Sequence, residues 1–257
     1  MKKLLLLLIP LIFACTKKTE HGLKVAATPV PHAQMLEYIK PDLAEQGINL
    51  IIIVTDDYNL PNRALADHEI DANFFQHLPF LKEQIKEFDY PIEEFAKVEI
   101  EPMGIYSTKY STLEEIPTNG TIAIPNDPTN EARALLLLQD QGLIELDNPY
   151  NLSATVVNIN QNPRNLKFIE VDAAMLPRTL TDVDAAAINT NFALEAHLSP
   201  KQALALENKD SPYVNILAIR IGDGIRSDLQ ALKSALTSEK MREYIIKNYR
   251  GAVIPAF

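Results

Sequence analysis

The sequence predicts an α/β protein built from two modules, and two observations carry that prediction. Apolar, β-branched runs that suit buried strands alternate with amphipathic helices along the chain, a pattern typical of mostly parallel sheets. The plan of strand, turn and helix then starts again near Tyr106. With 257 residues, 47% of them hydrophobic, the chain is long enough for one large domain or two modest ones.

The first module begins at Leu23 with the short strand LKVAAT. The next segment, PHAQMLEYIKPDLAEQG, is predicted to be a helix because Leu36, Ile39 and Leu43 recur at helical spacing. The apolar run INLIIIVT (48–55) is a predicted strand. The alternation continues with helix LPNRALADHE, strand IDANFF, helix LPFLKEQIKEF and strand AKVEIEPMGIYS.

The second module has the same plan in TIAIPNDPTNEARALLLLQDQGLIEL, where Gly142 is placed to end the helix. Two further pairs of strand and helix are predicted in 165–198, followed by the strand SPYVNILAIRI. Two amphipathic helices then account for 228–251. Two α/β modules leave a crevice beyond the carboxyl ends of their strands, which is the expected ligand site.

Composition and motifs argue against several classes of function. The net charge is −10, from 24 Lys+Arg against 34 Asp+Glu, so nucleic acid is not an expected partner. The 8 glycines form no phosphate-binding loop, and the five histidines show no metal-ligand spacing. No G-x-S-x-G nucleophile motif is present. We therefore predict no cofactor, no metal and no enzymatic activity.

The N-terminal stretch MKKLLLLLIPLIFAC predicts an export signal over residues 1–14, which is too short to span a bilayer as a helix. Cys15, the only cysteine, ends the apolar run as the lipidated cysteine of a bacterial lipobox would. Residues 15–22 would then form a lipid anchor and a short polar tether. The alternative is an incidental thiol in a discarded leader.

Arg133 lies among apolar neighbours in TIAIPNDPTNEARALLLL (121–138). Asp127 is a favourable N-cap and Pro128 suits the first helical position, so Arg133 falls in the second turn of a predicted helix. Its side chain would lean back toward the helix start, where free N–H groups and the helix dipole favour an anion. We predict that Arg133 holds a carboxylate; the alternative is an arginine on the solvent face.

Aromatic residues gather in DANFFQHLPF (71–80), where Phe74, Phe75, His77 and Phe80 surround a predicted strand-to-helix turn. Aromatic side chains at the end of a strand can form the apolar wall of a pocket. Core packing is the alternative for these rings, and a structural hydrogen bond is the alternative for the histidine.

Three asparagines follow or open apolar strands: Asn189, Asn191 and Asn215. An amide can accept from an ammonium and donate to a carboxylate, so asparagine suits both ends of a zwitterion. Asparagine is also a common turn residue, which is the alternative for each of them.

Eight phrases, in order across residues 23–257, resemble the methionine-binding lipoprotein family often called MetQ or NlpA. They are KVAATPVPHAQMLEYIKP, DANFFQHLPFL, VEIEPMGIYSTKY, TIAIPNDPTNEARALLLL, NLKFIEVDAAMLPRTL, DVDAAAINTNFALEA, KDSPYVNILAIR and GAVIPAF. The resemblance implies a bilobal periplasmic-binding-protein fold with two crossover strands, lobe 1 being 23–104 plus 213–257 and lobe 2 being 105–212. It also implies a monomeric, lipid-anchored protein of the cell envelope that delivers L-methionine to the permease and ATPase of an ABC importer.

The same resemblance assigns ligand contacts. Arg133, Asn189 and Asn215 would hold the amino-acid head. Tyr58, Phe75 and His77 would surround its side chain. Phe80 stands where the family usually has tyrosine, so a ring remains without its hydroxyl, and Ala132 replaces a common glycine.

Three other readings stay open at this point. In the first reading, the ligand would be a methionine derivative, D-methionine or a small peptide. The protein would be an extracytoplasmic enzyme on the same scaffold in the second, and a lipoprotein kept for surface contacts in the third.

Overall fold

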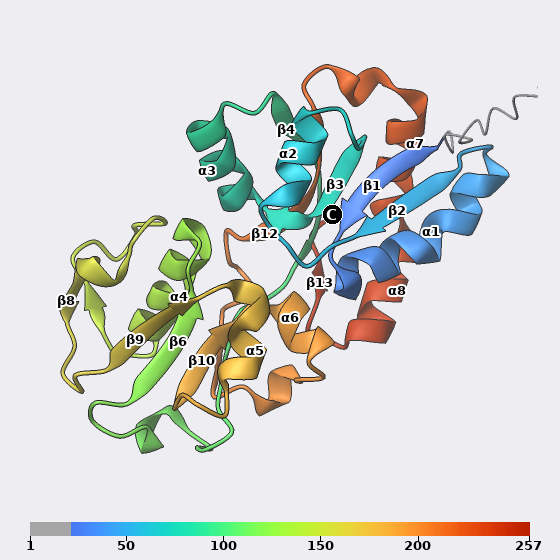
Figure 1. The fold of residues 1–257 in the computed structure, drawn as a ribbon. Coiled ribbons are helices and arrows are strands. Elements are labelled where there is room, and N and C mark those ends of the chain that lie inside the picture. The colour runs from blue at the N-terminus through green and yellow to red at the C-terminus, as the bar shows by residue number, and fades with distance from the viewer. Residues whose placement is uncertain (1–21) are drawn as a thin grey trace, which may run out of the picture.

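Two β-sheets, each covered by helices on both faces, form the two lobes of the protein (Figure 1). The computed structural model describes residues 22–257. The leader (1–14), Cys15 and the tether up to residue 21 lie outside the described residues. Within the described part of the chain, no helix is both long and apolar enough to cross a membrane.

Lobe 1, as we use the term, is the unit around a six-stranded sheet. Across the sheet the strands are β13 (Ile254–Pro255), β4 (Ile92–Ile100), β12 (Val214–Arg220), β3 (Ala72–His77), β1 (Leu23–Ala27) and β2 (Leu50–Val54). The strand β1 runs parallel to β2 and β3, whereas β12 runs antiparallel to β3 and β4. The polypeptide leaves this lobe after β4 and returns to it at β12.

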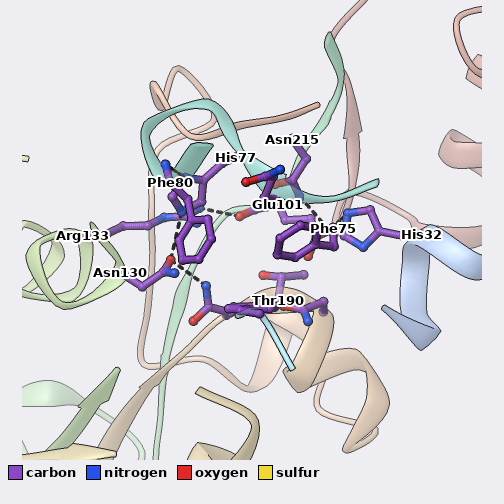
Figure 2. Close-up of a pocket in the computed structure, with 13 residues that line it drawn as sticks. His32, Phe75, His77, Phe80, Glu101, Asn130, Arg133, Thr190 and Asn215 are labelled. Carbon is purple, nitrogen blue, oxygen red and sulfur yellow. Dashed lines mark hydrogen bonds and ion pairs between the residues drawn. The ribbon is translucent and has the colours of Figure 1, made fainter. Parts of the chain in front are cut away.

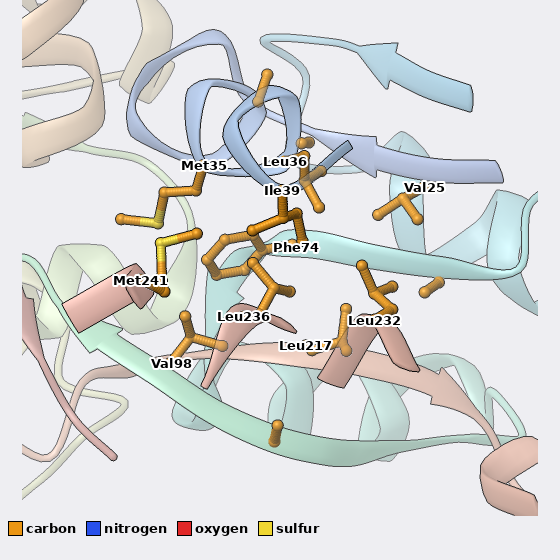
Figure 3. Close-up of a cluster of buried hydrophobic side chains, with 14 of the residues drawn as sticks. Val25, Met35, Leu36, Ile39, Phe74, Val98, Leu217, Leu232, Leu236 and Met241 are labelled. Carbon is orange, nitrogen blue, oxygen red and sulfur yellow. The ribbon is translucent and has the colours of Figure 1, made fainter. Parts of the chain in front are cut away.

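Five helices cover the two faces of this sheet (Figure 1). They are α1 (Gln34–Glu45), α7 (Ser227–Leu236) and α8 (Glu239–Tyr249) on one face, and α2 (Leu60–Ala66) and α3 (Leu78–Phe88) on the other. Alternation along β12 feeds both cores, because Leu217 packs toward α7 and α8 while Ile216 packs toward α2 and α3. Figure 3 shows the first core, in which Phe74 lies between Met35 and Leu236.

Lobe 2 is built around a five-stranded sheet. Its strands, in order, are β11 (Ala205–Leu206), β5 (Gly104–Tyr106), β10 (Ala185–Ile188), β6 (Thr121–Pro125) and β9 (Lys167–Val171). The helix α4 (Pro128–Asp140) covers one face, and α5 (Leu176–Thr179) and α6 (Thr190–Glu195) cover the other. A separate two-stranded ribbon pairs β7 (Glu145–Leu146) with β8 (Ile159–Gln161).

The prediction of a bilobal α/β fold is confirmed, but the prediction of mostly parallel sheets is wrong. In lobe 1, β4, β12 and β13 are joined by antiparallel pairings. In lobe 2, β5 pairs antiparallel with both β10 and β11. The cause is the double crossing between lobes: β4 leads out of lobe 1 and β12 leads back in, so neighbouring crossing strands must run in opposite directions. This pairing sets Asn215 opposite Glu99.

Candidate ligand-binding site

A small, largely enclosed cavity lies between the two lobes. Figure 2 shows its lining. In lobe 1 it comes from the turn 29–33, the segment before α2, the ends of β3 and β4, the start of α3 and the start of β12. In lobe 2 it comes from the end of β10 and the first turns of α4 and α6. The lining residues are His32, Tyr58, Phe75, Gln76, His77, Phe80, Glu101, Asn130, Arg133, Asn189, Thr190, Asn191 and Asn215. All seven residues predicted to contact ligand are in this set, so the fold brings them together; their contact with a ligand stays a prediction.

The guanidinium of Arg133 lines the cavity and is buried, with the side chain only 4% exposed. Its Nε donates to Oε1 of Glu207 at 3.0 Å, and its Nη2 donates to Oε2 of Glu207 at 2.6 Å and to the carbonyl of Glu101 at 2.7 Å. The guanidinium also lies 4.5 Å from the ring centroid of Tyr213. One edge of the fork is therefore occupied by the protein itself.

The remaining nitrogen of Arg133, Nη1, has no hydrogen-bond partner among residues 22–257. It is the donor available to a ligand carboxylate, so Arg133 can hold one through a single nitrogen. The expectation of free N–H groups at the start of α4 also fails. Asp127 caps that helix, and its Oδ1 accepts from the amide of Asn130 at 3.0 Å.

Asn130 links the two lobes at one side of the cavity (Figure 2). Its Oδ1 accepts from Nδ2 of Asn189 at 2.8 Å and lies 3.0 Å from Nε2 of His77. Since Nδ1 of His77 accepts from the amide of Phe80, the proton of this imidazole is on Nε2 and the ring is neutral. Burial first, and Arg133 second, lower the pKa of His77 to about 3. This histidine is an uncharged bridge between lobes.

An aromatic wall closes the opposite side of the cavity. The rings of Tyr58, Phe75 and Phe80 surround one another, with centroid separations of 5.7 to 6.0 Å. Phe192, at the start of α6, completes the wall from lobe 2, with its centroid 5.1 Å from that of Tyr58. The hydroxyl of Tyr58 donates to Oδ1 of Asn191 in lobe 2 at 2.7 Å. The wall is thus shared between the lobes.

Two buried amide atoms at the cavity lack any hydrogen-bond partner in the described structure: Oδ1 of Asn189 and Nδ2 of Asn191. Both side chains are at least nine-tenths buried. A buried polar atom without a partner costs about 1 to 3 kcal/mol, so these two atoms are available to hydrogen-bond a polar ligand. One is an acceptor and the other a donor, as the two ends of an amino acid require.

Asn215 lies in β12 and is directed by two buried glutamates. Its Nδ2 donates to Oε1 of Glu99 at 2.7 Å and to Oε1 of Glu101 at 3.0 Å. His32 lies beside them, with Nε2 at 3.2 and 3.3 Å from the same two oxygens. Burial is the main reason that the pKa of Glu99 is raised to about 7 and that the pKa of Glu101 is also raised.

His32, Glu99 and Glu101 are the one group of histidine and acidic residues within 22–257 whose atoms are close enough to hold a metal ion. The amide NH2 of Asn215 already donates to the carboxylate oxygen of each glutamate. Each donated hydrogen points from a neighbouring amide into the space between the carboxylates that a cation would occupy, so the arrangement suits protons better than a metal. No other feature of the lining is typical of a cofactor site.

Sequence reasoning missed five lining residues, namely His32, Gln76, Glu101, Asn130 and Thr190. It also missed Phe192, whose ring contacts Tyr58 of the wall. Glu101 directly follows β4, and the sequence pattern of that strand does not indicate which face of the sheet the glutamate side chain occupies. Asn130 could have been found, because it sits at the third position of a helix whose N-cap was recognised. His32 and Phe192 gave no signal beyond the expected core packing.

Comparison with known proteins identifies the family. The model of the NlpA lipoprotein family matches residues 23–257. The chain is 39% identical to the methionine-binding lipoprotein MetQ of Bacillus subtilis, over 99% of each protein. It is 36% identical to the D-methionine-binding lipoprotein MetQ of Salmonella typhi, over 93% of this chain and 89% of that one.

A solved structure agrees with the sequence relatives. A nutrient binding protein from Burkholderia cenocepacia, bound to methionine, matches with a TM-score of 0.89 at 42% identity, covering 91% of this chain and all of that one (100%). The sequence match and the shared two-lobed architecture agree, and the chain belongs to the NlpA lipoprotein family.

Proposed function

We propose that the protein binds L-methionine as a zwitterion between its two lobes and delivers it to the permease and ATPase of an ABC importer. The observation that carries the proposal is one buried cavity that joins a cationic donor and unpaired amides to an aromatic wall. Relatives named as methionine-binding proteins support the choice of ligand.

The head of the ligand would lie near Arg133 and the asparagines. Nη1 of Arg133 and Nδ2 of Asn191 are the donors for its carboxylate, and Oδ1 of Asn189 is an acceptor for its ammonium. A hydrogen bond to a charged group contributes about 1.5 to 3 kcal/mol. Asn215 orients the head from the lobe 1 side of the cavity.

The side chain of the ligand would lie against Tyr58, Phe75, Phe80 and Phe192. A thioether beside an aromatic ring gains about 0.3 to 1.5 kcal/mol, and each buried CH2 group contributes about 0.8 kcal/mol. His77 supports this wall as a neutral group, with its ring centroid 6.1 Å from that of Phe80. An apolar, polarizable tail of methionine length fits this chemistry better than a charged one.

A ligand held in this way would join the lobes. We propose lobe boundaries at 23–104 plus 213–257 and at 105–212, with closure about the two crossings between them. Head contacts come largely from lobe 2 and wall contacts largely from lobe 1, so the ligand stabilises the closed arrangement over an open one.

Binding without catalysis is part of the proposal. The hydroxyls that line the cavity belong to Tyr58 and Thr190, and both donate to protein oxygens, to Asn191 and to the carbonyl of Pro102. Neither has a neighbouring general base of the kind that activates a nucleophile. We also propose a monomer, anchored to the membrane through lipid on Cys15 and facing the periplasm or cell exterior.

Small molecules released from the denatured, purified protein test the proposal directly. Mass spectrometry should find methionine at close to one molecule per chain. Titration of the emptied protein should then favour L-methionine over D-methionine, a methionine derivative and a methionyl dipeptide. A different stoichiometric molecule, or no binding of any of these ligands, would refute the proposal.

A further inference from the structure

An acidic cluster of Glu101, Glu99 and His32 lies at the floor of the cavity. Glu101 is the only carboxylate among the thirteen lining residues, and its side chain is nine-tenths or more buried. Behind it lie Glu99, which is fully buried, and His32, which is 1% exposed. Two ionised carboxyl groups side by side in a low-dielectric site are costly unless a proton or a cation neutralises one of them.

The other charges of the cavity are already matched. Arg133 is paired with Glu207, and His77 is neutral because its Nε2–H faces Asn130. A zwitterion that places its carboxylate on Nη1 of Arg133 brings an ammonium with no counter-charge among these groups. Glu101 is the one anion in the lining that can supply it.

We propose that the carboxylate of Glu101 accepts the ammonium of the bound amino acid and that binding expels a proton held by Glu101, Glu99 and His32. This inference rests on the proposed function. In the empty site the carboxyl pair shares one proton. When the ammonium arrives, its N–H groups donate to the Glu101 carboxylate, and the shared proton leaves to solvent, so no other reactant is needed.

The contacts within the cluster favour a shared proton there in the empty protein. Nε2 of His32 lies 3.2 Å from Oε1 of Glu99 and 3.3 Å from Oε1 of Glu101, but it is not aligned for a hydrogen bond with either. Nδ1 of His32 lies 2.6 Å from Oγ1 of Thr28, and a neutral imidazole that accepts there carries its own hydrogen on Nε2. The proton to be expelled is therefore the one shared by the two carboxyl groups, whose Oε1 atoms both lie against Nε2 of His32 and Nδ2 of Asn215. Oε2 of Glu99 is buried and has no hydrogen-bond partner, which also suits a protonated carboxyl.

Electrostatics favour the same protonation state. Burial and the neighbouring Glu99 raise the pKa of Glu101, while His32 and Arg133 act in the opposite direction and do not cancel the rise. Burial lowers the pKa of His32, which keeps its imidazole neutral. The titratable and charged groups that face Glu101 are His32 from the turn 29–33, Glu99 from β4, Arg133 from α4, Tyr249 from α8 and Tyr58 before α2.

The sign of the pH effect follows from these shifts. The ligand's positive charge lowers the pKa of the pair below its value in the empty site, where the pKa of Glu99 is about 7. At pH values between the pKa of the pair in the ligand-bound site and its pKa in the empty site, binding therefore releases a proton. Affinity weakens as pH falls through that range. The weakening reaches at most about tenfold per pH unit for one proton.

Calorimetry of the full chain in detergent tests the inference without any mutation. Methionine is titrated near neutral pH in two buffers that differ in enthalpy of ionisation, and the difference in measured heat gives the protons exchanged. Release of a substantial fraction of one proton is expected. The analogue 4-(methylthio)butyrate, which lacks the amino group, should bind more weakly and release none.

Variants locate the proton. Glu101→Gln should abolish the buffer dependence and weaken methionine binding at least tenfold. Glu131→Gln is the matched control: Glu131 is also a buried acid with a pKa raised to about 7, but it accepts from the amide of Val156 and does not line the cavity. It should leave affinity and proton release unchanged.

The outcomes separate this inference from the function on which it rests. Methionine binding by the wild-type chain with no proton exchange, or with the same exchange in Glu101→Gln, overturns the inference and leaves the proposed function intact. Absence of methionine binding by the wild-type chain overturns both.

Discussion

The hydroxyl of Tyr58 in lobe 1 donates a hydrogen bond to Oδ1 of Asn191 in lobe 2 at 2.7 Å, directly across the cavity. This bond can form only when the lobes are closed. Removing it in Tyr58→Phe keeps the ring in the aromatic wall and leaves Asn191 without its partner. We expect methionine affinity to fall by about two- to tenfold, the equivalent of one hydrogen bond, with little change in melting temperature.

A control on the surface isolates this effect. Tyr150 is 85% exposed, and Tyr150→Phe removes a hydroxyl far from any ring of the wall. Calorimetry should find wild-type affinity in this variant. Equal affinity in Tyr58→Phe and wild type would show that the bond between lobes does not contribute to ligand capture.

Arg133 should matter for folding as well as for binding. Arg133→Ala removes the donor Nη1, which we expect to weaken methionine binding by at least about 2 kcal/mol. It also leaves the mostly buried carboxylate of Glu207, which is 12% exposed, without its partner, and breaking such an ion pair costs up to about 3 to 5 kcal/mol of stability. The pairing with Glu207 therefore predicts a loss of stability as well as a loss of affinity.

A double variant separates the two contributions. In Arg133→Ala with Glu207→Gln, the unpaired charge is gone and the glutamine oxygen can still accept from the amide of Met103, as Glu207 does. Chemical denaturation should show that stability is largely recovered. Calorimetry should show that methionine binding is not. Recovery of binding in the double variant would argue against a direct contact between Arg133 and ligand.

How far the sequence anticipated the structure depends on the range of the interaction. The start of α4 was predictable because Asp127 and Pro128 act on their own backbone. The aromatic wall was predictable in part, since Phe75 and Phe80 are close in sequence and share one strand-to-helix turn.

Contacts between distant segments were not predictable in this way. Glu207 reaches Arg133 across 74 positions of the chain, and Asn215 reaches Glu101 across 114. No local pattern marks either acid, and both depend on how the crossing segments bring the two lobes together. The same crossing explains the antiparallel strands that periodicity alone could not reveal. Resemblance to a family supplied the predicted ligand residues, but not the partners that hold them in place.

The aromatic wall should control which side chain is accepted. Phe80→Ala removes one ring that packs on Tyr58 and Phe75. Lost burial and lost contact with sulfur together predict about a ten- to fiftyfold weaker methionine affinity. Affinity for alanine, whose methyl group is too short to reach the ring, should change little. Titration with both amino acids gives the ratio, and an equal loss for both would place Phe80 at the head of the ligand instead.

His77 makes stability depend on pH in a defined direction. Its pKa is about 3 in the folded protein, lowered first by burial and then by Arg133, whereas an unfolded histidine titrates near pH 6.5. Between those values the unfolded chain binds a proton that the folded chain does not. Stability is therefore complete above about pH 6.5 and falls as pH decreases toward 3, by up to about 1.4 kcal/mol per unit from this group.

The variant His77→Asn tests that slope, because asparagine can still cap α3 by accepting from the amide of Phe80, as Nδ1 does now. We expect its denaturation free energy to depend less on pH between about 4 and 6 than that of the wild type. His68→Asn provides the control, since His68 is exposed and its φ of 60° is one that asparagine tolerates. That control should keep the full wild-type slope. An unchanged slope in His77→Asn would mean that His77 is already protonated when folded, which its hydrogen bond from the amide of Phe80 to Nδ1 does not allow.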